Sequence, residues 1–248
     1  MMNRSATGIA FLALFFTAGC ATDAVNVAEP EPIPDPPSAA IGLWEVSDGP
    51  GAPFLLSPPV NRERHAPVVL FVPGGAGIRD HAMPTFERWL SKGKGREQVW
   101  LLVPYTQDGD LSDEGERVQT ALRRVIDERA SERSPVHLAG TSNGGRSAFR
   151  WLLEQPERYT SFLGAPALPA PDPGDEALGN ALAQKRVLLA VGSEDGGWLE
   201  ESRSLEARLG ALGIDCQLMV FEGEGHILSE EFDESVFFEF WLAEEHAR

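Results

Sequence analysis

Three residues in this sequence are of types that together can turn a hydroxyl group into a nucleophile, and each follows a short apolar segment. Residues 140–144 have the sequence G-T-S-N-G, so Ser142 lies between glycines that permit a tight turn. A serine hydroxyl is a poor nucleophile until a base removes its proton. Imidazole can serve as that base, and a carboxylate fixes its tautomer and stabilises the imidazolium that forms. The chemistry to expect of such a set is attack on a carbonyl group.

His226 is the histidine best placed to act as the base. The sequence contains histidines at positions 65, 81, 137, 226 and 246. His226 ends the run E-G-E-G-H directly after the apolar residues 217–221, and glycines in this run allow a loop to carry it toward a neighbouring strand end. His137 lies within an apolar segment, where it is expected to fill the core, and the other three flank loops or lie near the chain end.

The carboxylate is expected from the run G-S-E-D-G-G at residues 192–197. This run follows the apolar residues 187–191, so it lies just past a predicted strand. Asp195 is favoured over Glu194 because glycines on either side permit a turn that aims a short side chain, whereas Glu194 could be a solvated loop charge. The predicted set is therefore Ser142, Asp195 and His226.

Apolar segments that alternate with segments of helical period would bring these residues together. The apolar segments span residues 68–72, 99–103, 136–139, 161–163, 187–191 and 217–221. Continuous apolar runs are typical of strands buried on both faces of a parallel sheet, and the clearest helical stripe lies at residues 118–126. The pattern predicts an α/β fold, with an open, mainly parallel sheet, helices on both faces, and residues 43–46 and 53–56 as an antiparallel edge. Ligands bind at the carboxyl ends of such strands, where all three residues fall.

The chain order Ser142, Asp195, His226, with the serine in a strand–turn–helix context, resembles the α/β-hydrolase fold and differs from the orders of chymotrypsin and subtilisin. The resemblance covers about residues 68–226. It implies an esterase-like serine hydrolase without a cap domain, because the proline-rich residues 166–185 are too few to build one.

The resemblance also implies a backbone oxyanion hole. Asn143, the residue after the nucleophile, would donate one N–H, and the glycine-rich loop at residues 73–77 would donate another through Gly74 or Gly75. Pro73 stands where the family's HGGG form has a histidine.

The implied reaction is hydrolysis of a carboxylic ester through an acyl-enzyme on Ser142, with a small-molecule or polymeric ester as the substrate. Two alternatives stay open: a serine peptidase on the same fold, and a catalytically silent lipoprotein that binds a ligand or partner. No metal-ligand cluster or phosphate-binding loop occurs in the sequence, so neither a metal nor a cofactor is expected. Trp198 and Trp241 are expected to pack in the core.

Charge and cysteine content argue against other classes of function. The 248 residues carry 38 Asp and Glu against 21 Lys and Arg, a formal charge of −17, which repels phosphate backbones and disfavours nucleic-acid binding. The two cysteines, Cys20 and Cys216, can form at most one disulfide and cannot build a Cys-based zinc cluster. Cys216 lies in an apolar strand candidate and is expected to be a small core residue.

Residues 1–19 have the composition of a secretion signal. Arg4 precedes the apolar residues 9–18, which are too few to span a hydrocarbon core of about 30 Å. The sequence T-A-G-C at residues 17–20 resembles the lipobox of bacterial lipoproteins, with threonine in place of the usual leucine. The alternative is ordinary cleavage after a small residue such as Gly19.

The lipobox resemblance implies that Cys20 is lipidated and that the protein is exported to the cell envelope, with a lipid membrane as its partner. Ala21 is not the aspartate that retains such proteins in the inner membrane, which favours the outer membrane. Residues 20–41 contain five prolines between positions 30 and 37, which prevent helix and sheet from propagating and predict an extended tether. One folded domain is expected over residues 42–248, without an internal repeat.

Overall fold

The computed structural model describes residues 32–33, 43–60, 62–91, 93–229 and 231–243. The predicted signal segment 1–19, Cys20 and almost all of the predicted tether lie outside the described residues. Within these described ranges, none of the helices is both long and apolar enough to cross a membrane.

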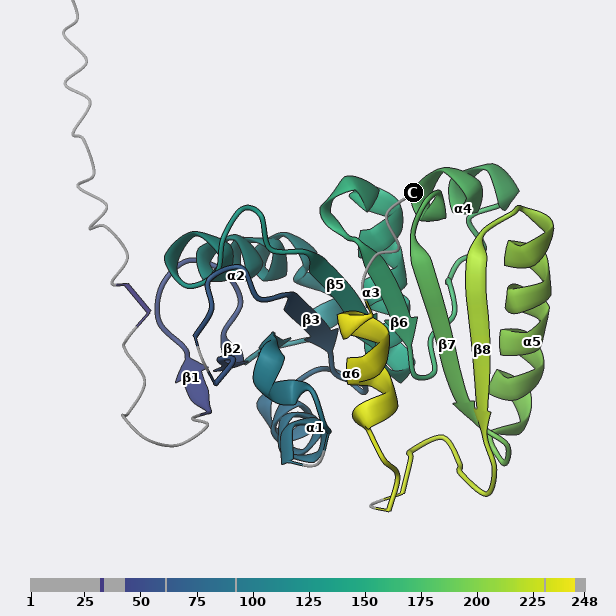
Figure 1. Cartoon of the computed structure of the whole chain (residues 1–248), viewed down its shortest axis with the longest axis horizontal. Helices are drawn as coiled ribbons and strands as arrows, with labels where there is room; N and C mark the ends of the chain where they lie inside the picture. Colours follow the sequence, from purple (N-terminus) through teal and green to yellow (C-terminus); the bar gives the residue numbers. More distant parts are fainter. Residues whose placement is uncertain (1–31, 34–42, 61, 92, 230, 244–248) are drawn as a thin grey trace, which may run out of the picture. The chain divides into compact units, whose positions relative to one another are not determined.

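The described residues form one eight-stranded sheet (Figure 1). Its strands are β1 Trp44–Val46, β2 Phe54–Ser57, β3 Val68–Val72, β4 Trp100–Pro104, β5 Val136–Gly140, β6 Ser161–Gly164, β7 Arg186–Gly192 and β8 Asp215–Phe221. Their order across the sheet is β1-β2-β4-β3-β5-β6-β7-β8. The β1–β2 and β2–β4 pairs are antiparallel and the remaining pairs are parallel, which confirms the predicted sheet and its antiparallel edge.

In the described part of the chain, five α-helices and three short 3₁₀ turns lie between the strands, and a sixth helix follows the last strand. The helices are α1 Arg79–Ser91, α2 Gly115–Glu128, α3 Ser142–Glu154, α4 Asp175–Leu182, α5 Gly196–Ala211 and α6 Ser235–Leu242. The 3₁₀ turns are Arg96–Gln98, Leu111–Asp113 and Pro156–Arg158. Two helices, α1 and α4, were not expected from the helical stripes. Pro84 lies inside α1, and α4 has only 8 residues and follows four closely spaced prolines, so neither gives a strong periodic signal.

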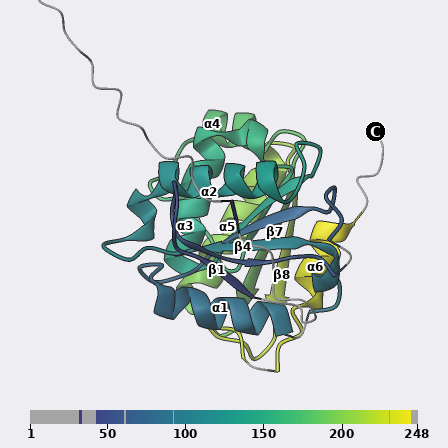
Figure 2. The ribbon, with the colours of Figure 1, turned by 90° about the vertical axis from the view of Figure 1, so that its left-hand side faces the viewer.

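The sheet separates two apolar cores because its central strands are buried on both faces. In β3, Val68 and Leu70 join one core, whereas Val69 and Phe71 join the other. Helices α2 to α5 contribute to the first core, and α1 and α6 contribute to the second. Figure 2 shows α1 and α2 on opposite sides of the sheet. Burial of each such side chain stabilises the fold by roughly 1.5–3 kcal/mol, so the sheet is a firm support for the loops that follow its strands.

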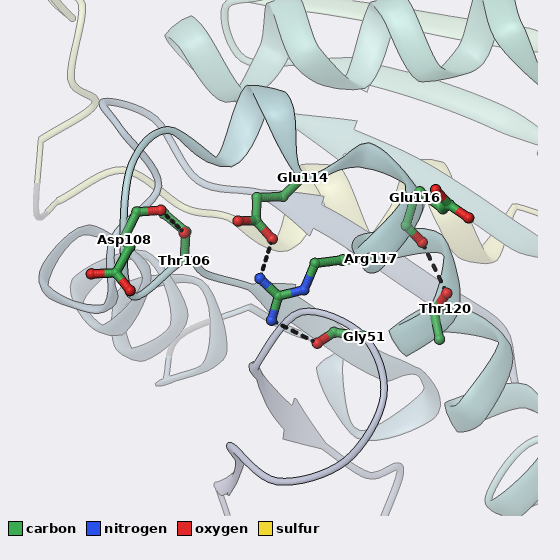
Figure 3. Close-up of polar contacts among 7 residues, drawn as sticks. All are labelled: Gly51, Thr106, Asp108, Glu114, Glu116, Arg117 and Thr120. Carbon is green, nitrogen blue, oxygen red and sulfur yellow. Dashed lines mark hydrogen bonds and ion pairs between the residues drawn. The ribbon is translucent and has the colours of Figure 1, made fainter. Parts of the chain in front are cut away.

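The turn between β1 and β2 is fastened to the start of α2 (Figure 3). Arg117 donates from Nη2 to the Gly51 carbonyl at 3.1 Å and from Nη1 to Glu114 Oε2 at 2.6 Å. In the loop that leads from β4 into α2, Thr106 Oγ1 donates to the Asp108 carbonyl at 2.7 Å. One arginine therefore ties the edge hairpin to the layer of helices that covers the first core.

Ile33 packs into the core on the α2 side of the sheet, although the sequence assigns it to an extended tether. Its side chain is 1% exposed, its N–H donates to Glu128 Oε2 at 2.5 Å, and its carbonyl accepts from Arg129. Backbone groups that lose water on burial need such partners. At this position the segment that precedes residue 42 is therefore held against the end of α2.

We predict that His137 makes the protein less stable in mild acid. The imidazole is buried in β5 with Nδ1 2.8 Å from Ser161 Oγ, and burial, with a contribution from Arg186, lowers its pKa to about 3. In the unfolded chain the pKa is about 6.5, so below that pH the unfolded state binds a proton that the folded state does not. Stability is therefore lost as the pH falls, by about 2 kcal/mol between about pH 7 and about pH 5.

Urea unfolding of the wild type and of His137→Gln at these two pH values measures this loss. The His137→Gln variant should lose about 2 kcal/mol less than the wild type over this interval. His65→Gln, which removes an exposed histidine, is the matched control and should lose as much as the wild type. An equal loss in all three proteins would contradict the prediction.

Candidate active site

Ser142 lies on a tight turn between β5 and α3, and its backbone is strained. Its φ is 55°, in the left-handed region that residues other than glycine enter at a cost of roughly 1–2 kcal/mol. The Ser142 N–H donates to the Pro166 carbonyl at 2.7 Å, which helps to hold this conformation. Strain of this kind persists only where the surrounding structure enforces it, and it concentrates at functional sites.

The glycines on either side of Ser142 are required by close packing of the backbone. A Cβ on Gly144 would lie 2.1 Å from the Pro73 carbonyl oxygen and 2.4 Å from that of Val72. A Cβ on Gly140 would lie 2.8 Å from the Gly144 carbonyl oxygen. The first turn of α3 is therefore pressed directly against the end of β3, and Ser142 lies at the carboxyl edge of the central strands.

The structure brings the three predicted residues into one hydrogen-bonded chain. Ser142 Oγ lies 3.0 Å from His226 Nε2, and His226 Nδ1 lies 2.8 Å from Asp195 Oδ2. The side chain of Asp195 is 10% exposed and that of His226 is 38% exposed. The carboxylate is thus largely shielded from water, whereas the imidazole is partly exposed and lines a cavity together with Ser142. Such an arrangement is suited to moving a proton from the hydroxyl to the imidazole.

Two loops that follow neighbouring strands hold Asp195 and His226 in this register. The Ser193 N–H donates to the Phe221 carbonyl at 2.9 Å, and the Glu194 N–H donates to the Glu224 carbonyl at 2.9 Å. Asp195 is the N-cap residue directly before α5, and it is Asp195 rather than Glu194 that meets the imidazole. Because β7 and β8 are adjacent parallel strands, their carboxyl ends present both loops at one edge of the sheet.

Comparisons with known proteins support this architecture. No protein-family model and no curated protein matches the sequence. Among solved structures, the feruloyl esterase module from Clostridium thermocellum complexed with sinapinate has a TM-score of 0.61 and 13% identity, over 89% of this chain and 96% of that chain. Carboxyl esterase 2 from Tuber melanosporum has a TM-score of 0.58 and 16% identity, over 85% of this chain and 89% of that chain.

A thermostable esterase matches with a TM-score of 0.55 and 18% identity, over 73% of this chain. The chain spans only 54% of the length of that esterase. The domain has the α/β-hydrolase fold. This confirms the fold expected from the chain order of Ser142, Asp195 and His226.

In this α/β-hydrolase fold, the loop at residues 73–77 lies beside the candidate nucleophile. The Cα of Gly74 is so close that a Cβ on it would lie 3.4 Å from Ser142 Cβ. The loop is held by its neighbours, since the Thr106 N–H donates to the Gly77 carbonyl and the Leu111 N–H donates to the Ala76 carbonyl, both at 2.9 Å. The presence of Pro73 in place of histidine therefore leaves the loop well supported.

The predicted oxyanion donors have N–H groups that are free to meet a ligand. Among the hydrogen bonds of the described residues, none uses the N–H of Gly74, Gly75 or Asn143. Gly75 has φ 64°, and a Cβ there would lie 2.5 Å from His81 Nδ1, so this position of the loop requires glycine. The geometry leaves donors on both sides of Ser142.

A cavity of about 410 Å³ opens next to Ser142. Its lining consists of Gly74, Gly75, Asp80, His81, Pro84, Thr85, Thr141, Ser142, Ala165, His226, Ile227 and Leu228. Helix α1 contributes Asp80, His81, Pro84 and Thr85 to the lining, and Ile227, which follows the candidate base directly, is 78% exposed. The cavity has the size of a small-molecule site.

The wall formed by α1 is anchored at the start of the helix. Arg79 donates from Nε and Nη2 to the two carboxylate oxygens of Glu45, at 2.6 and 2.7 Å, and Tyr105 Oη donates to Glu45 Oε1 at 2.7 Å. The hydrogen bonds from Arg79 and Tyr105 lower the pKa of Glu45 to about 2. The Glu45 carboxylate therefore stays ionised over the working pH range and joins β1 to α1 and to Tyr105, the residue directly after β4.

Two residues near the site were not identified from the sequence. The Trp198 ring centre lies 5.3 Å from that of His226, although the sequence assigned this tryptophan to the core. Trp198 also packs against the core on the α2 side of the sheet, so it contacts both that core and His226. His81, which was expected to flank a loop, lies on α1 and lines the cavity. The position of Trp198, three residues after Asp195 at the start of a helix, was a signal that could have found it.

Asp80, His81 and His226 line the cavity, and a metal site there would need their side chains to lie close enough to bind one ion. In the part of the chain that the structure describes, no group of three or more histidine, cysteine, aspartate or glutamate side chains is close enough to hold a metal ion.

We predict that Gly144→Ala destabilises the domain by at least about 2 kcal/mol, because the new Cβ would collide with two carbonyl oxygens of the β3 end. Gly179→Ala is the matched control. Gly179 lies within α4, nothing approaches its Cβ position within 4 Å, and alanine there should stabilise the helix by roughly 0.5–1 kcal/mol. Urea unfolding measures both changes, and equal stability of the two variants would contradict the assigned packing.

Proposed function

We propose that this domain is a serine hydrolase that cleaves carboxylic esters of small-molecule or polymeric substrates through an acyl-enzyme on Ser142. The observation that carries the proposal is the chain of contacts from Ser142 Oγ to His226 Nε2 at 3.0 Å and from His226 Nδ1 to Asp195 Oδ2 at 2.8 Å. The strained φ of Ser142 and the adjacent cavity support it.

In the proposed mechanism, Ser142 Oγ attacks the ester carbonyl carbon while His226 Nε2 takes the hydroxyl proton. Asp195 stabilises the imidazolium. The tetrahedral intermediate collapses as His226 gives its proton to the leaving alcohol. A water molecule, deprotonated by His226, then attacks the acyl carbon, and the acid leaves as Ser142 regains its proton.

The N–H groups of Asn143 and of Gly74 or Gly75 would stabilise the negative charge on the intermediate. Each such donor contributes roughly 10²–10³ in rate because it meets charge that develops only in the transition state. Their lack of any other acceptor among the described residues supports this role, since no existing bond must break when the substrate binds.

The structural neighbours support an ester as the substrate. Those named above are described as a feruloyl esterase module, a carboxyl esterase and a thermostable esterase. We extend this reaction class to the present domain because it shares their fold and has a hydrogen-bonded serine, histidine and aspartate at its strand ends.

We predict that Ser142→Ala lowers the rate of hydrolysis of 4-nitrophenyl butyrate by at least roughly 10³-fold, because the attacking atom is removed. The release of 4-nitrophenolate measures the rate. Ser204→Ala, which changes an exposed serine on α5, is the control and should keep full activity.

A fluorophosphonate probe tests the same assignment without a chosen substrate. It should label the wild type and Ser204→Ala and not label Ser142→Ala. If Ser142→Ala still hydrolyses the ester at the wild-type rate, the proposal is wrong. A matched 4-nitroanilide should be cleaved far more slowly than the ester, and faster cleavage of the anilide would favour a peptidase.

We further propose that the chain is exported and held in the cell envelope by a lipid on Cys20. The support is the sequence of residues 1–20, in which a basic and an apolar stretch lead to T-A-G-C. An apolar lipid anchor paired with an acidic domain would keep the domain in solution beside the membrane.

We predict that the full-length chain, expressed in a bacterium that processes lipoproteins, incorporates labelled palmitate and sediments with membranes. Cys20→Ala should do neither, because the acylated thiol is gone. Cys216→Ala is the control, since burial raises the pKa of the Cys216 thiol to about 12 and keeps it unreactive. Equal labelling of Cys20→Ala and the wild type would rule out this anchor.

A further inference from the structure

A second cavity, of about 270 Å³, opens beside helix α3. It is lined by Asn143, the residue after Ser142, and by Arg146 and Arg150 of α3. None of its lining residues lines the 410 Å³ cavity. An ester has an acyl part and an alcohol part. Ser142 lines the first cavity, and its neighbour Asn143 lines the second.

Arg146 is the cation of this second cavity that is available to a ligand. Its side chain is exposed, and among the described residues no carboxylate pairs with it. Arg150 differs, because it donates to the Ser112 carbonyl and its Nε lies 3.8 Å from Glu154 Oε1. Arg146 therefore makes no ion pair among the described residues, whereas Arg150 does.

The guanidinium of Arg146 lies over the face of an aromatic ring. Its Cζ lies 5.0 Å from the centre of the Trp198 ring, and the same ring lies 5.3 Å from the imidazole of His226. An arginine stacked on an aromatic face keeps its N–H groups free at the edge of the guanidinium plane, where they match the two oxygens of a carboxylate. Arg146 also lies one helical turn after Ser142, on the same side of α3.

We propose that Arg146 is a specificity residue that binds a carboxylate carried by the ester substrate. This inference rests on the proposed ester hydrolysis. A monoanion fits the surroundings better than a phosphate dianion, because Asp110 also lines the cavity and the chain carries a formal charge of −17. Asp110 Oδ1 accepts the Ser112 N–H at 2.8 Å and so caps a turn, and among the ion pairs of the described residues none joins Asp110 to Arg146.

Two pairs of esters, each with a carboxylate in one member and an uncharged group at the same position in the other, test this assignment. For the acyl side, mono-4-nitrophenyl adipate is compared with 4-nitrophenyl hexanoate. For the alcohol side, 4-carboxyphenyl acetate is compared with 4-carbamoylphenyl acetate. In Arg146→Gln, kcat/KM for the charged ester of one pair should fall roughly tenfold, mainly through KM, while the neutral ester changes by less than about twofold.

Three comparisons separate recognition from other effects. Arg146→Lys should retain part of the preference, since it keeps the charge but loses the planar fork. Arg123→Gln removes the same charge from α2, and should leave the preference unchanged. The preference of the wild type should weaken at high salt, because the contact is exposed.

The outcomes distinguish the two proposals. Retained hydrolysis of the neutral esters by Ser142→Ala overturns the proposed function, and this inference with it. If Ser142 is required and Arg146→Gln leaves the charged-to-neutral ratio of both pairs unchanged, or slows both members equally, the carboxylate site alone is overturned.

Discussion

The contact between the first turn of α3 and the end of β3 is the constraint on which the candidate site depends. The Cα of Gly144 lies so close to the carbonyl oxygens of Val72 and Pro73 that no side chain fits between them. Because the helix begins there, the chain must turn sharply out of β5, and Ser142 takes up the strain as a φ of 55°. The same contact brings the glycine-rich loop after β3 within van der Waals distance of Ser142. One close approach of backbone thus sets both the position of the hydroxyl and the position of the donors beside it.

The contact between Asp195 and His226 depends on a second, similar approach of backbone. A Cβ on Gly192 would lie 2.1 Å from the Glu224 carbonyl oxygen, so the loop after β7 is pressed against the loop after β8. The hydrogen bond from the Glu194 N–H to that carbonyl aligns them. Since the two strands are parallel neighbours, a rigid sheet transmits this alignment to Asp195 and His226. Catalytic geometry needs errors smaller than about 0.5 Å, and backbone contacts of this kind are stiffer than contacts between side chains.

The charged residues beside the candidate site are arranged differently on the α1 side and on the α3 side. On the side of α1, the charges of Arg79 and Glu45 neutralise each other and serve to fix the helix. On the side of α3, Arg146 lies over the Trp198 ring and has no carboxylate in an ion pair with it among the described residues. The chain as a whole is acidic and repels anions. Arg146 would weaken that repulsion close to Ser142.

The sequence by itself determined the features that depend on neighbours along the chain. Continuous apolar runs such as residues 68–72 specify strands buried on two faces, the glycines around Ser142 specify a tight turn, and the chain order indicated the fold. Tertiary structure alone decided which side chains surround the site. Helix α1 forms despite Pro84 because it packs on the sheet, Ile33 docks because α2 offers it partners, and Trp198 meets both His226 and Arg146. Local patterns follow from backbone sterics and periodicity, whereas contacts between distant segments arise only when the packed core fixes where each helix lies.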